Sequence, residues 1–294
     1  GAGLYWAVLG LRLTRETFFM LLTSWLLYLG LGALAGFIAG VFGVGGGLVI
    51  VPVLLWAFTL QGYDPTHLTH LAVGTSLATI IVTSVSAVNA HHRKGAVRWA
   101  LFRTLAPGLL IGAFLGARIA DALPGPWLQV IIGAFALYVA QGMLRYRLPV
   151  AGMPVAEHLP SGPAQMAAGG GIGVASAIFG IGGGSLTVPY LAHHGVRMQE
   201  AVATSSACGL PIALAGALGF ALFGQDSAGL PPGSWGFVHV PAFLGISVAS
   251  LVTAQLGARL AHRLSAVVLK RSFGGLLLLV GLVFLGRGGP ALLG

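Results

Sequence analysis

The residues best suited to chemistry in this chain form two glycine clusters within nearly the same string. Residues 42–52 read FGVGGGLVIVP, and residues 179–189, 137 positions further on, read FGIGGGSLTVP. Glycine runs interrupt helices, and an interruption in apolar sequence is tolerated at membrane depth only where the freed backbone is buried in protein or lines a polar cavity. Interrupted helices at matching places in two halves point to the substrate site of a transporter. The two strings therefore predict a transporter.

A helix that begins after each glycine cluster presents unpaired N–H groups and the positive end of its dipole. Two such ends near the membrane midplane would bind an anion without a buried Lys or Arg. A full charge there costs about 2.5–3.5 kcal/mol on insertion scales. Nucleotide binding is rejected, because neither string has the G-x-G-x-x-G or Walker A register. The predicted anion-binding glycines are Gly43, Gly45, Gly46, Gly47, Gly180, Gly182, Gly183 and Gly184.

Hydroxyl side chains at equivalent places are the second group of candidates. The pairs Thr75-Ser76 and Thr204-Ser205 stand near the start of apolar spans, and Ser185 follows the second glycine run. A hydroxyl in a membrane helix can instead bond a carbonyl of the preceding turn, but repetition of the Thr-Ser pair favours a role in binding. Two further repeat-related residues, Arg118 and Arg259, either attract anions in a vestibule or lie at the lipid interface as snorkelling side chains.

The composition places these motifs in a lipid bilayer. Of the 294 residues 56% are hydrophobic and 7% are charged, with a mean hydropathy of +0.93, whereas soluble domains carry about 25% charged residues. The net charge is +9, and the Lys and Arg residues stand between the apolar runs. This pattern indicates loops that face the cytoplasm rather than nucleic-acid binding. With one cysteine and no Cys/His/carboxylate cluster in the apolar runs, we expect no metal site, no cofactor and no enzyme activity.

The repeat extends over both halves of the chain. Ala72–Ser76 aligns with Ala201–Ser205, and Leu115–Ala120 aligns with Leu256–Ala261, in the same order. Each half contains a glycine-broken helix pair followed by three transmembrane helices, so we predict an all-α polytopic membrane protein of two inverted repeats with 8–10 helical segments. The predicted boundaries are an N-terminal segment at 1–20, repeats at 21–145 and 164–286, a cytoplasmic linker at 146–163 and a tail at 287–294.

The charges predict how the repeats are oriented. A broken pair that crosses the membrane twice or not at all leaves each half with an odd number of crossings, which inverts the second half. With the N-terminus outside, eleven of the 15 Lys and Arg residues fall on the cytoplasmic side, so N-out and C-out is favoured. Arg12 and Arg15 oppose this orientation. If each broken pair crosses once, the N-terminus lies inside and the repeats are parallel.

Two glycine ladders have a different interpretation. Gly32/Gly36/Gly40 and Gly108/Gly112/Gly116 recur at four-residue spacing, which lets helix backbones approach closely in lipid. We expect both ladders to be packing seams rather than ligand sites.

The repeated F-G-[VI]-G-G-G-x-x-x-V-P string, followed by A-x-x-T-S, resembles the TauE/SafE sulfite exporter family over about residues 30–286. The resemblance implies export of sulfite, sulfoacetate or other organosulfonates across a bacterial inner membrane, with the glycine and Thr-Ser positions as the site. Ser185 replaces Leu48 of the first copy, so the site need not be symmetric. The alternatives are an anion channel or an importer of sulfate or another small oxyanion. The expected partners are a small anion and the bilayer, and a homodimer is compatible with the sequence.

Overall fold

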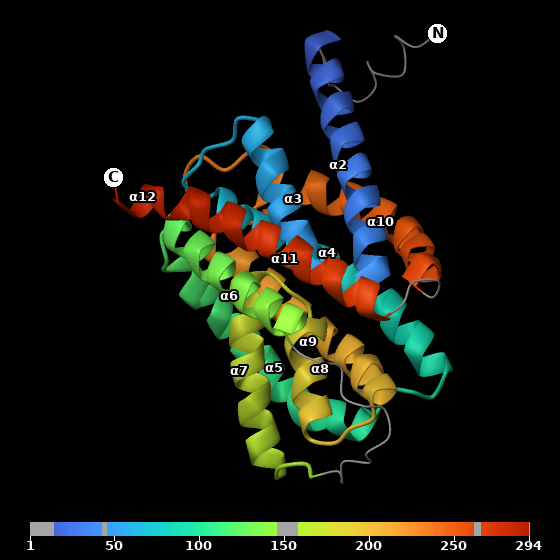
Figure 1. Cartoon of the computed structure of the whole chain (residues 1–294). Coiled ribbons are helices and arrows are strands. Elements are labelled where there is room, and N and C mark those ends of the chain that lie inside the picture. Colours follow the sequence, from blue (N-terminus) through green and yellow to red (C-terminus); the bar gives the residue numbers. More distant parts are fainter. Residues whose placement is uncertain (1–14, 43–45, 146–157, 262–265, 294) are drawn as a thin grey trace, which may run out of the picture.

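The computed structural model describes residues 15–42, 46–145, 158–261 and 266–293 (Figure 1). Within them a short antiparallel hairpin, β1 (Ser234–Trp235) with β2 (Val238–His239), accompanies a fold that is otherwise helical. The first half forms α2 (Arg15–Phe42), α3 (Gly47–Leu60), α4 (Leu68–Arg93), α5 (Trp99–Asp121) and α6 (Gly125–Arg145). The second forms α7 (Gly162–Phe179), α8 (Gly184–His193), α9 (Met198–Phe223), α10 (Val240–Ala261) and α11 (Ala266–Gly288), followed by α12 (Pro290–Leu293). The prediction of an all-α protein is confirmed.

Six helices of the described chain are long and apolar enough to cross a membrane. Their spans are Leu22–Val41, Leu68–Arg93, Trp99–Asp121, Met198–Phe223, Val240–Gly257 and Arg271–Leu292. By contrast α3 has 14 residues and α8 has 10, which correspond to about 21 Å and about 15 Å of helix. Neither can span a hydrocarbon core of about 30 Å. The multi-pass membrane architecture is confirmed, and each glycine break produces one short helix.

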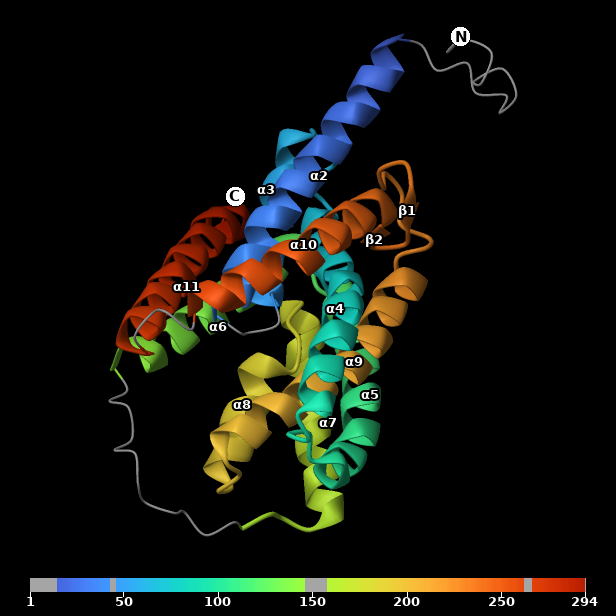
Figure 2. The ribbon, with the colours of Figure 1, turned by 90° about the vertical axis from the view of Figure 1, so that its right-hand side faces the viewer.

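In both broken pairs the short helix turns back alongside the helix that precedes it (Figure 2). The Tyr28 hydroxyl, midway along α2, donates to Oε1 of Gln61, which directly follows α3, at 2.9 Å. The second pair has an equivalent contact, because the amide of His158, ahead of α7, donates to the carbonyl of His194, just after α8, at 3.1 Å. This geometry favours a re-entrant pair, and the number of times each pair crosses the membrane stays a prediction.

The second half packs like the first half turned over. α4 and α9 are antiparallel, since Gly74 lies near Phe220 and Ser84 lies near Gly209. α2 packs along α10 and α7 packs along α5, while α6 packs against α11. If the two halves are exchanged, the contact of α2 with α10 becomes the contact of α7 with α5. The contact between α6 and α11 is its own equivalent. The inverted repeat predicted from the sequence is thus present in the helix packing.

The glycine ladders are the seams of this arrangement. A Cβ on Gly36 would lie 2.4 Å from the Cα of Ser250 in α10, and one on Gly112 would lie 2.1 Å from the Gly170 carbonyl oxygen in α7. Side chains at these places would force the helices apart, so only the absence of a Cβ allows the contact. The predicted packing role of both ladders is confirmed.

The centre of the molecule is formed by α4 and α9. In the apolar windows of these two helices 56% and 67% of residues are buried, compared with 28% in the window of α11. The outer helices expose large apolar side chains such as Leu244, Val252 and Leu279, as expected of a surface that faces lipid. The central pair therefore supplies the interior in which a polar site can be shielded from lipid.

Candidate functional site

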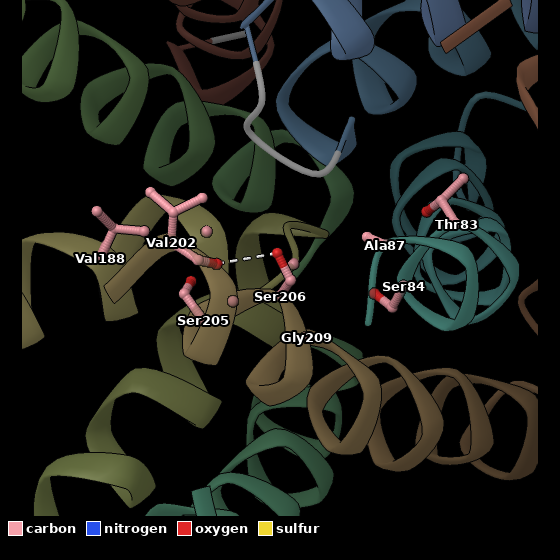
Figure 3. A pocket seen from close by; sticks show the side chains of 11 residues that line it. Thr83, Ser84, Ala87, Val188, Val202, Ser205, Ser206 and Gly209 are labelled. Atoms are coloured by element: carbon pink, nitrogen blue, oxygen red, sulfur yellow. Dashed lines mark hydrogen bonds between the residues drawn. The ribbon is translucent and has the colours of Figure 1, made fainter. Parts of the chain in front are cut away.

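A cavity of about 60 Å³ lies between α4, α8 and α9 (Figure 3). It is lined by Thr83, Ser84 and Ala87 of α4, by Gly182, Gly183, Gly184 and Val188 at α8, and by Val202, Ser205, Ser206 and Gly209 of α9. One water needs about 10–15 Å³ of such volume, so the cavity holds a compact ion or a few waters. None of these lining residues is ionisable, and any charge selectivity must come from dipoles and hydroxyl groups.

The second glycine break forms one wall of the cavity. α7 ends at Phe179, and the following Gly180 has a φ of 64°, in the left-handed region that favours glycine. α8 then begins at Gly184, and the Thr187 amide donates to the Gly183 carbonyl at 2.9 Å. The amides ahead of Thr187 have no acceptor within the helix, and no side chain caps them. The positive end of α8 thus borders the cavity.

Gly183 fixes how closely the tip of α8 approaches α9. A Cβ at this position would lie 2.6 Å from the Ser205 carbonyl oxygen and 2.8 Å from the Gly209 nitrogen. Both are backbone atoms, which cannot rotate away as a side chain can. The glycine is therefore required for the contact that brings the α8 amides and Ser205 to the same cavity.

The Ser205 hydroxyl has no hydrogen-bond partner in the described structure, although the residue is 0% exposed. Leaving such a group unpaired costs about 1–3 kcal/mol, and an unpaired buried group calls for an explanation. The neighbouring Ser206 hydroxyl donates to the Val202 carbonyl at 2.9 Å, drawn as a dashed line in Figure 3. Ser84, 8% exposed, brings a hydroxyl from the other repeat. Among the described residues that line the cavity, Ser205 is the one with a buried hydroxyl that has no hydrogen-bond partner.

The start of α3 packs against the second glycine break. A Cβ on Gly47 would lie 2.4 Å from the Gly180 carbonyl oxygen and 2.7 Å from the Cα of Ile181. Ser76, the repeat equivalent of Ser205, donates to that same carbonyl at 2.9 Å. The two breaks therefore touch, but the start of α3 meets a protein carbonyl where the start of α8 meets a cavity.

The two threonines of the Thr-Ser pairs bind backbone amides. Thr75 Oγ1 accepts a hydrogen bond from the His239 amide at 2.9 Å, and Thr204 Oγ1 accepts one from the Arg98 amide at 3.0 Å. His239 and Arg98 are repeat-equivalent and directly precede α10 and α5. Each threonine thus holds the start of a neighbouring helix in place, which adds a structural role that the sequence did not indicate.

The predicted site residues fall into four groups in the structure. Four of them line the cavity: Gly182, Gly183, Gly184 and Ser205. Others lie outside its lining, namely Gly46, Gly47, Thr75, Ser76, Gly180, Ser185 and Thr204. Gly43 and Gly45 lie outside the described residues. The two predicted vestibule residues, Arg118 and Arg259, are exposed and do not line the cavity either. A role in anion binding stays a prediction for all of them.

Arg118 and the basic residues nearest the cavity lie at opposite ends of the molecule. Arg118 is paired with Asp121 at 2.6 Å and lies over the ring of Phe223 at 5.6 Å, at the end of α5 remote from Arg98. The end of the molecule nearer the cavity carries Arg93, Lys94, Arg98 and Arg197, and we call it the basic end. Ala87 of the cavity lies six residues before Arg93, about 9 Å along the helix axis. Arg98 and Arg197 both approach Glu200 there, the former at 3.8 Å.

Three cavity hydroxyls lie outside the predicted site, those of Thr83, Ser84 and Ser206. A pattern for the first two is present in the sequence. Thr83-Ser84 repeats Thr75-Ser76 eight positions later, a spacing that returns to the same face of a helix. The small and apolar lining residues Ala87, Val188, Val202 and Gly209 have no comparable pattern and are identified by the packing alone.

Apolar spans, paired helix breaks and a cavity lined by hydroxyl groups between two inverted halves define a polytopic membrane transporter. The family profile described as "Sulfite exporter TauE/SafE" matches residues 28–284. This match covers most of the chain, and the chain belongs to the TauE/SafE family.

Relatives agree with this assignment. A "Probable membrane transporter protein" of Haemophilus influenzae is 34% identical over 255 residues, which cover 87% of this chain and 96% of the relative. Another probable membrane transporter protein, from Methanocaldococcus jannaschii, is 25% identical over 271 residues, covering 89% of this chain and 97% of the relative. No solved structure matches the chain.

Proposed function

We propose that this transporter carries compact sulfur oxyanions, sulfite and small sulfonates, outward across the inner membrane by alternating access around the cavity at the start of α8. The observation that carries the proposal is the unpartnered Ser205 hydroxyl beside the uncapped end of α8, in a cavity whose lining residues carry no charge. The name of the matched family supplies the substrate class.

The cavity supplies the chemistry that a small oxyanion needs. Hydrogen bonds to an anion are charge-assisted and stronger than neutral ones. A helix N-terminus adds about 0.3–1 kcal/mol when exposed and up to about 2 kcal/mol when partly buried. These donors bind an anion modestly, which suits a site that must also release it. The volume of about 60 Å³ favours sulfite over sulfonates with long organic tails.

The packing at the start of α3 supports a carrier rather than a channel. Gly180 and Ile181 fill the space beside Gly47, while the cavity beside α8 stays open. A carrier in one of its two end states has this asymmetry, with one half-site accessible and the other packed. We place the basic end in the cytoplasm, with both chain termini outside, because short cytoplasmic loops are enriched in Lys and Arg. Counterflow in proteoliposomes distinguishes the proposed carrier from a channel. Sulfite on the trans side accelerates the flux of labelled sulfite through a carrier but not through a channel.

Replacing Ser205 with alanine should weaken sulfite binding about tenfold or more, because the lost hydrogen bond goes to a charged ligand. The measurement is the half-saturation concentration for sulfite flux in proteoliposomes. The matched control is Ser176→Ala: Ser176 of α7 is likewise 0% exposed with an unpartnered hydroxyl, yet it does not line the cavity. Equal half-saturation concentrations for Ser205→Ala and the wild type would contradict the proposed site.

A further inference from the structure

The cavity has a repeat-equivalent region of very different polarity. α4 and α9 align at an offset of 129 positions, so every cavity residue on one helix has a partner on the other. The cavity hydroxyl residues Thr83, Ser84 and Ser206 correspond to Ile212, Ala213 and Leu77. Only the pair Ser205 and Ser76 carries a hydroxyl on both sides. We call the region around Ser76 the counterpart region; it contains Ser76, Leu77, Ile80, Ile212 and Ala213.

The residues of the counterpart region are fully buried in this structure. Its five residues are each 0% exposed. Leu77 contacts Gly216 of α9, and Ile80 lies beside Gly47 at the start of α3. Gly180 lies against Val51 and Val73 from the adjoining walls, and its carbonyl takes up the Ser76 hydroxyl. By contrast Thr83, Ala87, Val202 and Ser206 of the cavity are partly exposed.

Alternating access in an inverted repeat exchanges the roles of the two halves. In the opposite state Ser76 and the start of α3 would face the anion, with Ile212, Ala213 and Leu77 where the cavity has three hydroxyl residues. The start of α3 would then take the place of the start of α8, and the hydroxyl side chains around it would differ. An anion that leaves water for an apolar lining loses hydrogen bonds that nothing replaces.

We propose that the transporter binds its anion unequally on its two faces, tightly from the basic end and weakly from the opposite end, with Ser84 and its equivalent Ala213 as the main determinants. This inference rests on the proposed function, because it concerns the same anion. A tight site on the side of capture and a weak one on the side of release suit a protein that moves anions away from the basic end.

The inequality has a kinetic consequence. A carrier without a coupling ion cannot shift the equilibrium of its substrate, so the ratio of maximal rate to half-saturation concentration must be equal in the two directions at zero membrane potential. The face with the lower half-saturation concentration must therefore also have the lower maximal rate. Both quantities should differ between the faces, and by the same factor.

The experiment measures sulfite flux in each direction in proteoliposomes at zero membrane potential. The orientation of the protein is read from Asn89→Cys, an exposed position near the basic end, with a membrane-impermeant thiol reagent; the native Cys208 is buried. We expect a half-saturation concentration lower by about tenfold or more for each added hydrogen bond when sulfite is presented at the basic end.

Two exchanged variants test the determinants. Ser84→Ala should raise the half-saturation concentration at the basic end and reduce the difference between the faces. Ala213→Ser should lower the half-saturation concentration at the opposite end, which is a gain that misfolding cannot mimic. The Ser176→Ala variant should keep the wild-type ratio.

The possible outcomes separate this inference from the proposed function. Saturable sulfite flux with equal half-saturation concentrations at the two faces, or an Ala213→Ser variant with the wild-type ratio, overturns the inference and leaves the proposed function intact. Absence of saturable sulfite flux from wild-type protein that is folded and reconstituted overturns both.

Discussion

Alanine in place of Gly112 is expected to lower the melting temperature sharply and to remove most of the folded protein. The new Cβ would lie 2.1 Å from the Gly170 carbonyl oxygen, whereas ordinary contact begins at 3.4 Å. α5 and α7 would have to separate by more than an ångström along a seam where both helices are glycine-rich. Overpacking of this kind costs about 1–3 kcal/mol or more, a large part of the total stability of a protein. The measurement is thermal unfolding in detergent, followed through tryptophan fluorescence.

The control for this prediction is Gly171→Ala in α7, the helix that faces Gly112. A Cβ on Gly171 would meet nothing within 4 Å, and alanine in a helix is favoured over glycine by about 0.5–1 kcal/mol. Gly171→Ala should therefore melt at or above the wild-type temperature. Equal melting temperatures for Gly112→Ala and Gly171→Ala would mean that the close approach of α5 and α7 does not contribute to stability.

Alanine in place of Gly183 is expected to abolish sulfite flux while leaving the helical fold assembled. The Cβ would press on backbone atoms of Ser205 and Gly209, 2.6 and 2.8 Å away, and would push the tip of α8 from α9. The α8 amides and the Ser205 hydroxyl would no longer converge on one anion. Displacement by about 1 Å of groups that must act together can cost about 100-fold, so the residual flux should be near the background of empty vesicles.

The readout for Gly183→Ala is flux per folded molecule, with the folded fraction taken from size-exclusion chromatography and thermal unfolding. Gly171→Ala again serves as the matched glycine-to-alanine control and should retain wild-type flux. A folded Gly183→Ala protein that transports sulfite normally would exclude the tip of α8 from the transport pathway. A Gly183→Ala protein that fails to fold would assign the residue to packing instead.

Much of the architecture follows from local patterns in the sequence. The two repeated glycine strings follow the ends of α2 and α7, because glycine lacks the side chain that favours helical backbone, whereas the run Gly169–Gly171 stays within α7. The four-residue spacing of Gly108, Gly112 and Gly116 places them on one helix face regardless of what lies opposite. The apolar runs are long enough to span, and the two matching strings reveal the repeat. These features depend on residues close together in the chain, so spacing and composition are sufficient to predict them.

The path of each broken pair could not be predicted in the same way. The sequence of residues 21–60 is compatible with a helix pair that crosses the membrane twice, once or not at all. The hairpin is evident only from contacts such as that between Tyr28 and Gln61. The end of α3 at Leu60, by contrast, agrees with the predicted bound of the first pair and is followed by Gly62, whose φ is 70°.

Local patterns in the chain are enough to predict a repeated all-α membrane protein with helix breaks at two equivalent places and hydroxyl pairs after each. Which of the two equivalent serines lacks a hydrogen-bond partner depends on the packing between the halves. Ser76 and Ser205 have the same local motif, but Ser76 is bonded to the carbonyl of Gly180, 104 positions away, while Ser205 faces a cavity. The physical reason is that a hydroxyl bonds whatever acceptor the packing brings within about 3 Å. That acceptor belongs to the other half of the chain, so no local pattern can encode it.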